Sequence, residues 1–234
     1  MLSKISSEQI YLGDYGWHTG RFHFSFADYD DPDNTNFGDL IAFNDFALTP
    51  NSGFSTHPHS EIEIISYCIE GELIHEDSMG NINILEAGDM QYTCAGSGIM
   101  HSESNQSHEL PLRFVQIWLR PESKNLLPCY SSRHIERNER LNKCLHLASG
   151  QPIQDVTRIR QDANIYVTEI ETGEVERINF DQDRQIYLAC LDGDLIANNL
   201  FLENGDSLKA WDEGELALEA VRTCHLLVVE VSRS

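Results

Sequence analysis

Four residues in the first half of the chain have the types and spacing to bind a metal ion together. His57 and His59 are separated by one residue, and so are His101 and Glu103. Because residues i and i+2 of a β-strand point to the same face, each pair would present both side chains to one space. If the two strands face each other, three imidazoles and one carboxylate converge. We therefore predict a site for a single divalent metal ion at these four residues.

This predicted ligand set favours a first-row transition metal. Imidazole and carboxylate groups suit such ions, and a set without thiolates is unlike the closed, cysteine-rich sites of structural zinc. An octahedral ion would keep open positions for a substrate oxygen and dioxygen, or for waters. Ligand type alone does not fix the metal, so iron, nickel, manganese, copper and zinc all stay open.

Other acidic and histidine side chains are weaker candidates for the site. Glu61 and Glu63 share the strand parity of the first histidine pair, so Glu63 could orient a ligand or replace one. The remaining histidines are isolated in the sequence and are interpreted as structural or surface residues. They are His18, His23, His75, His108, His134, His146 and His225.

Short β-strands must position these side chains. Apolar or alternating runs, separated by Gly, Asn and Asp turn signals, occur along the whole chain, as in a sandwich or barrel. Examples are IEIISYCI at 62–69, LRFVQIWL at 112–119 and HLLVVEV at 225–231. We predict an all-β protein, with the segment 131–144 as the best helix candidate.

An internal repeat predicts two such barrels in tandem. YCIEGEL at 67–73 is followed by LEAGDM, and YLACLDGDL at 187–195 is followed by LENGDSL. Two copies in the same order indicate a duplicated β-barrel. We predict a metal-binding domain at 1–130, a linker at 131–145 and a second domain at 146–234.

The second barrel is expected to lack the metal site. The positions that match the four predicted ligands, counted from the shared Gly-containing turns, hold other residues. They are Asn179, Asp181, Leu218 and Ala220. The second domain would then be structural, or would cover the first.

Composition excludes several classes of protein. The chain has 16 basic and 38 acidic residues, a formal net charge of −22, which repels nucleic-acid phosphates and anionic lipids. No run approaches the ~20 apolar residues of a membrane span, and residues 1–12 lack the apolar core of a signal peptide. The six cysteines are scattered, as expected of free thiols. We expect a soluble, cytoplasmic monomer that binds neither nucleic acid nor membrane.

Longer motifs in the sequence resemble those of the pirin family. The resemblance covers most of the chain and is strongest over residues 15–120. The matching segments are FSFADYDDP at 24–32, HPHSEIEIISYCIEGELIHEDSMGN at 57–81, AGSGIMHSESN at 95–105 and WDEGELAL at 211–218.

The resemblance implies a bicupin fold, with two jelly-roll-like cupin barrels in tandem and metal only in the N-terminal one. Carried over by position, the ligands are His57, His59, His101 and Glu103, and the usual metal of the family is Fe(II). This set agrees with the one that strand parity gives.

The resemblance also implies an activity. Some bacterial pirins, like the related quercetinases, cleave flavonols with dioxygen and release carbon monoxide. We therefore expect a quercetin 2,3-dioxygenase-type enzyme that acts on a flavonol-like substrate and O2, with Glu103 as both ligand and general base.

Two other functions stay open. Eukaryotic members of the family act as partners of transcription regulators, and some bacterial ones bind metabolic enzymes. A non-catalytic, metal-dependent regulatory protein is therefore the alternative, and an acidic surface suits a basic partner. The third is a metal-binding barrel that acts on an unrelated small molecule, because cupins support many chemistries.

Overall fold

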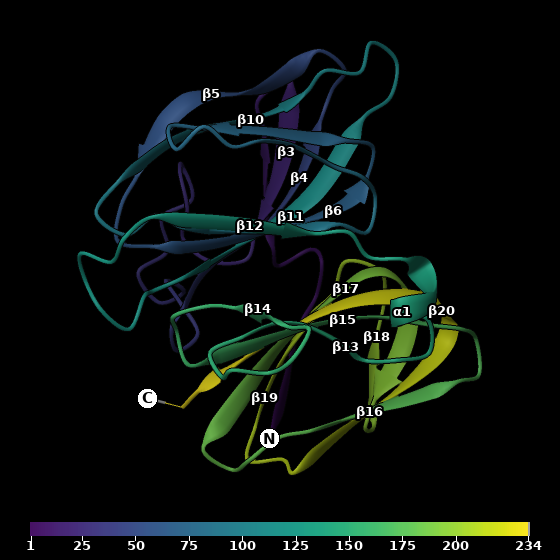
Figure 1. Ribbon diagram of the computed structural model, residues 1–234. Coiled ribbons are helices and arrows are strands. Elements are labelled where there is room, and N and C mark those ends of the chain that lie inside the picture. The colour runs from purple at the N-terminus through teal and green to yellow at the C-terminus, as the bar shows by residue number, and fades with distance from the viewer. Residues whose placement is uncertain (234) are drawn as a thin grey trace. The chain divides into compact units, whose positions relative to one another are not determined.

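The computed structural model describes residues 1–233, and its regular secondary structure is almost entirely β-strand (Figure 1). The all-β prediction is confirmed. The segment 131–144, predicted as a helix, contains only the four-residue helix α1 (Arg137–Arg140), since its first residues belong to a strand. No helix in the described part of the chain is long and apolar enough to cross a membrane.

The chain forms two units. The N-terminal unit comprises residues 11–135 and 159–161, and the C-terminal unit comprises residues 1–10, 136–158 and 162–234. Each unit is built from antiparallel strands, apart from one short parallel pair in the C-terminal unit.

Two antiparallel sheets make up the N-terminal unit. The seven-stranded sheet has the order β12 (Cys129–Arg133), β9 (Met90–Cys94), β6 (Glu63–Glu70), β11 (Leu112–Leu119), β4 (Leu40–Leu48), β3 (His18–Phe22) and β2 (Tyr11–Asp14). The four-stranded sheet has the order β5 (Ser52–His59), β10 (Ile99–Asn105), β7 (Leu73–Asp77) and β8 (Ile82–Leu85).

A shared apolar core joins these two sheets. It contains Phe46 and Phe114 from the seven-stranded sheet and Leu73 and Leu85 from the four-stranded sheet. The central strand β6 is buried over most of its length, which explains why its sequence does not alternate between apolar and polar residues.

The turn after β6 requires a glycine. Gly71 has φ +78°, and a Cβ there would collide with the carbonyl oxygen of Pro111. Gly193, its counterpart in the repeat, has φ +85° and the same constraint against the carbonyl oxygen of Thr223. Both turns therefore need the left-handed backbone that glycine adopts without strain.

The C-terminal unit is one nine-stranded sheet that curls around its own core. Its strand order is β1 (Leu2–Ile5), β19 (Ser207–Trp211), β17 (Arg184–Ala197), β20 (Glu215–Ser232), β15 (Ala163–Ile170), β13 (Leu145–Ser149) and β14 (Thr157–Arg158), with β16 (Val175–Asn179) on β20 and β18 (Leu200–Leu202) on β17. Register shifts interrupt the pairing of the long strands β17 and β20, and such bulges bend a sheet.

The positions expected to replace the metal ligands are not ligand-like in this unit. Leu218 and Ala220 are buried in its hydrophobic core, and Asn179 and Asp181 are exposed. Among residues 1–233, the groups of side chains with metal-ligand spacing all lie in the N-terminal unit.

The N-terminal residues pair across the length of the chain. We expected residues 1–10 in the first domain, but β1 pairs antiparallel with β19 in the C-terminal unit, with Leu2 opposite Ala210 and Ile5 opposite Ser207. A four-residue strand whose partner lies some 200 residues away leaves no local pattern in the sequence.

Glu63 ties a distant segment to the N-terminal unit. Its buried carboxylate accepts hydrogen bonds from the Tyr92 hydroxyl and from the backbone N–H groups of Arg160 and Gln161, the latter two at 2.7 Å. Burial raises the pKa of Glu63, and the three donors oppose this shift. The buried charge of the Glu63 carboxylate is therefore stabilised by all three hydrogen-bond donors.

Replacing Glu63 with glutamine is expected to lower the free energy of unfolding by about 2–4 kcal/mol, because an amide turns an N–H group toward at least one of the donors. Urea unfolding measures the loss. Tyr92→Phe removes one donor without adding another, so we expect a smaller loss of about 1–2 kcal/mol. Equal losses in the two variants would contradict this account of Glu63.

Candidate metal centre

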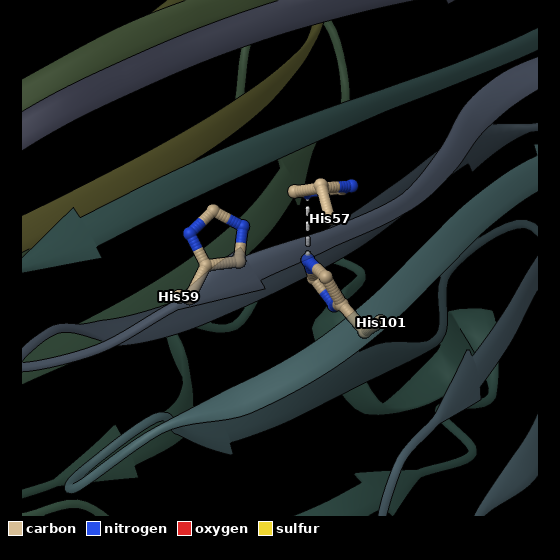
Figure 2. Close-up of side chains that lie close together, drawn as sticks. All are labelled: His57, His59 and His101. Carbon is tan, nitrogen blue, oxygen red and sulfur yellow. Dashed lines mark hydrogen bonds between the residues drawn. The ribbon is translucent and has the colours of Figure 1, made fainter.

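Three of the predicted ligands converge on one point in the N-terminal unit (Figure 2). His57 and His59 come from β5, and His101 lies directly opposite His57 on the paired strand β10. The ring centroids are 4.6–4.7 Å apart in all three pairs. Strand parity thus brings the two histidines of β5 to the same side, as the i, i+2 spacing predicts.

One hydrogen bond sets the tautomer of His57, and its second ring nitrogen faces a ring nitrogen of His101. His57 Nδ1 lies 2.8 Å from the carbonyl oxygen of Ser55, so it carries the proton and leaves the Nε2 lone pair free. This Nε2 is 3.1 Å from Nε2 of His101. His59 Nε2 is buried and has no hydrogen-bond partner in the structure. Such an arrangement fits a cation that takes the place of a proton between the rings.

Burial keeps two of the three imidazoles neutral at physiological pH. It lowers the pKa of His59 to about 4 and that of His101 to about 3, and the neighbouring histidines lower both further. A ligand must be neutral imidazole, so the site does not have to release bound protons from these rings to accept a metal.

Glu103 lies beside the histidine cluster and is held by three donors. Its Oε1 accepts hydrogen bonds from Ser66 Oγ and Gln91 Nε2, both at 3.0 Å, and its Oε2 accepts one from Gln116 Nε2 at 2.6 Å. The carboxylate is within 4.8 Å of ligand atoms of His75 and His101. The structure therefore places Glu103 next to His101, but not within the tight group of three histidines.

His75, which the sequence indicated as structural or surface, is a buried neighbour of the site. It stacks on Tyr130 with a centroid distance of 4.6 Å, and its Nε2 lies 3.3 Å from Asp77 Oδ2. It faces Glu103 across the β7–β10 pair. An alternating His-x-Asp on a strand just after the Gly71 turn is the signal that could have indicated it.

Glu63 is not an alternative ligand, although its parity in the sequence suggested one. Glu61 adopts φ +56°, which ends β5 before β6 begins and breaks the alternation between them. Glu63 then points to the donors on Tyr92, Arg160 and Gln161 described above.

A cavity of about 530 Å³ opens beside His57, His59 and Glu103. Its size is within the range of small-molecule sites. Trp118 meets His59 edge to face at a centroid distance of 5.1 Å, and its Nε1 donates to Gln116 Oε1 at 2.8 Å. Trp118 in the cavity wall is thereby hydrogen-bonded to Gln116, which in turn donates to Glu103. Its aromatic lining is Tyr15, Trp17, Phe22, Phe26, Phe46, Phe54 and Trp118.

Substituting leucine for Gln116 is expected to weaken metal binding about 10–100-fold, the usual cost of removing a group that orients a ligand. The variant removes the donor to Glu103 Oε2 and leaves the Trp118 N–H without its acceptor. Competition with a coloured chelator measures the affinity. Gln106→Leu, at an exposed position, is the matched control. Equal affinities in the two variants would show that Gln116 does not support the site.

The fold and the site define a class: a barrel of antiparallel strands with histidines on two paired strands and a cavity beside them. Residues 5–119 match the family described as Pirin, and residues 146–231 match the Quercetinase C-terminal cupin domain. The tandem-cupin prediction is confirmed.

Related proteins extend this match along the whole chain. The Pirin-like protein of Caulobacter vibrioides is 35% identical over 233 residues, which cover 99% of this chain and 100% of the relative. The Quercetin 2,3-dioxygenase of Escherichia coli is 32% identical over 217 residues, or 93% of each chain. The chain belongs to the pirin family.

Solved structures agree with the family. The bacterial pirin YhhW from Escherichia coli, in complex with nickel(II), superposes with a TM-score of 0.94 at 28% identity, over 100% of both chains. A quercetin 2,3-dioxygenase from Acinetobacter baumannii has a TM-score of 0.78 at 16% identity, over 99% of this chain and 79% of its own. At 16% identity, the similarity to the Acinetobacter baumannii structure supports only the shared fold.

Proposed function

We propose that the protein is a metal-dependent dioxygenase of the quercetin 2,3-dioxygenase type, which cleaves flavonols with O2 and releases CO. The observation that carries this proposal is the position of His57, His59 and Glu103 at the wall of an aromatic cavity of about 530 Å³, with His101 grouped beside the two histidines. A cavity lined by aromatic rings suits a flat, aromatic substrate. The names of relatives at 32–35% identity support the same reaction.

His57, His59 and His101 are proposed to hold the metal ion, with Glu103 as the fourth ligand. Fe(II) is the ion we propose, and nickel, manganese, copper and zinc are the alternatives that imidazole and carboxylate ligands also accept. A bound divalent ion supplies Lewis acidity, which lowers the pKa of a neighbouring hydroxyl.

Glu103 is proposed as the general base. A carboxylate at the cavity wall can receive the proton of the flavonol 3-hydroxyl, a transfer that typically contributes 10²–10⁴-fold to rate, as an order of magnitude. Ser66, Gln91 and Gln116 fix the carboxylate through its two oxygens. The aromatic walls would bind the flavonol rings and keep water away from the reacting atoms.

An aerobic quercetin assay tests the proposal. Iron-loaded protein is expected to bleach quercetin, to consume O2 and to release CO in amounts equal to the quercetin lost. Phe26→Ala, in the cavity wall, should raise KM with little change in kcat, because the ring is proposed to bind substrate without touching the reacting atoms. Protein that binds iron stoichiometrically but neither bleaches quercetin nor releases CO would contradict the activity on this substrate.

The acidic surface favours a second candidate function. A net charge of −22 suits a non-catalytic, metal-dependent protein that docks onto a basic face of a metabolic enzyme or transcription regulator. We place either function in the cytoplasm. A partner that is captured in stoichiometric amount by the iron-loaded protein, is absent with the metal-free protein and is released by moderate salt would favour this reading.

A further inference from the structure

Two cysteines of the N-terminal unit face each other across a strand pair. Cys94 ends β9 and Cys129 begins β12, and the two are direct partners in the antiparallel register. Directly opposed residues in such a pair have Cα atoms about 4.5–5.5 Å apart. This range lies within the roughly 4.4–6.8 Å that a disulfide spans, so the strand register gives the two cysteines a separation suited to a disulfide.

The two thiols already interact and differ in character. Their side chains are joined by a hydrogen bond, and the Cys129 sulfur also accepts the backbone N–H of Cys94. Cys129 is partly exposed, whereas Cys94 is buried. A reagent in solvent can therefore reach the Cys129 thiol, whereas the Cys94 thiol is shielded from solvent.

The surroundings favour the thiolate of Cys129. The hydrogen bonds from Cys94 and the nearby charge of Arg160 lower the pKa of Cys129, against the opposing effects of burial and of the Glu63 charge. Burial raises the pKa of both Cys68 and Cys144 to about 12, and it also raises the pKa of Cys190 and Cys224. Because the thiolate is the reactive form, Cys129 is the cysteine primed to react at neutral pH.

We propose that Cys94 and Cys129 form a redox-active pair, which hydrogen peroxide closes to a disulfide bond. The Cys129 thiolate attacks one peroxide oxygen, the O–O bond breaks, and hydroxide leaves and takes up a proton to become water. The Cys94 sulfur then attacks the resulting sulfenic acid, and the S–O bond breaks as the S–S bond forms. The Cys94 proton leaves with the hydroxyl group as a second water. The two thiols supply the two electrons that reduce the peroxide.

The disulfide would join two strands of the seven-stranded sheet whose side chains contact Glu103 and His75. β9 supplies Gln91, which donates to Glu103, and β12 supplies Tyr130, whose hydroxyl donates to Gln91 and whose ring stacks on His75. The proposed modification site is therefore separate from the metal ligands, although it lies on the strands that support them.

The test is peptide mapping of the folded, metal-containing protein after brief exposure to hydrogen peroxide, a catalase quench and alkylation. We expect a linked peptide containing Cys94 and Cys129, the loss of two thiols per chain, and full reversal by dithiothreitol. Cys129 should react at least about tenfold faster than Cys144. Diamide, which oxidises thiols without metal chemistry, should give the same link. A folded protein that reacts at Cys129 no faster than at Cys144, or that yields no linked peptide, overturns the proposal.

Single variants separate the two steps. Cys94→Ser should leave Cys129 as a sulfenic acid that dimedone traps, and Cys129→Ser should leave Cys94 as an unmodified thiol. Cys144→Ser is the matched control and should form the link at the wild-type rate. If a variant fails to fold, the wild-type protein in urea serves as the comparison: a link that forms equally fast in the unfolded chain also overturns the proposal.

Discussion

Replacing His101 with alanine is expected to lower metal affinity by more than about 100-fold, beyond the loss typical of groups that only orient a ligand. The reason is the central position of this ring. Its Nε2 is 3.1 Å from Nε2 of His57, its centroid is 4.7 Å from that of His59, and it also belongs to the group with His75 and Glu103. Without it, β10 offers no imidazole to the pair on β5. Elemental analysis after iron loading and dialysis against a chelator measures the loss.

A matched variant separates this effect from general destabilisation. His108→Ala removes an exposed histidine that lies just beyond the end of β10, and it should retain metal like the wild type. Because a ligand that binds only the folded state stabilises it, adding metal should raise the Tm of the wild type and of His108→Ala, but not that of His101→Ala. A His101→Ala protein that keeps one metal ion per chain would contradict the proposed ligand set.

The histidine cluster could be predicted because it depends on local geometry. His57 and His59 are on the same face of one strand by the period of the strand alone, and so are His101 and Glu103. The one further assumption was that the two strands face each other. In the structure they are instead neighbours in one sheet, since β5 pairs with β10 and places His101 opposite His57. The pairing brings the rings together without any contribution from loops.

The donors of Glu103 could not be predicted, because they depend on the register of several strands. Gln116 lies opposite Ser66 in the β11–β6 pair, and Ser66 lies opposite Gln91 in the β6–β9 pair. All three therefore form one row across the sheet, and all three donate to the same carboxylate. No short stretch of sequence contains this row. A local sign was the presence of Gln116 among the apolar residues Phe114, Val115 and Ile117 of β11.

Parity also failed where a strand was interrupted. The alternation of His57, His59 and Glu63 holds only if one strand continues through all of them, and the positive φ of Glu61 ends it. A single left-handed residue redirected Glu63 from the metal site to the segment at 159–161. Such a residue is not evident from sequence, since glutamate rarely adopts this conformation.

The substitution of Glu103 by glutamine is expected to separate metal binding from catalysis. Because the three histidines remain, the variant should still bind metal at saturating concentrations. Flavonol cleavage should nevertheless fall about 10²–10⁴-fold in kcat, because an amide cannot take up the proton. The aromatic cavity is unchanged, so KM for quercetin should stay near the wild-type value. Steady-state kinetics at saturating metal, with metal content measured on the same samples, checks both expectations.

Two comparisons show whether this loss reflects the base itself. Glu76→Gln removes the same charge from an exposed position on β7 and should leave kcat unchanged. Gln116 donates to the Glu103 carboxylate at 2.6 Å, so we expect Gln116→Leu to affect the reaction mainly through Glu103. The Gln116→Leu substitution should therefore lower kcat far less in the Glu103→Gln enzyme than in the wild-type enzyme, because residues that act as one unit give non-additive effects. Additive losses would mean that Gln116 has a role of its own in the cavity, and a Glu103→Gln enzyme with wild-type kcat would rule out Glu103 as the base.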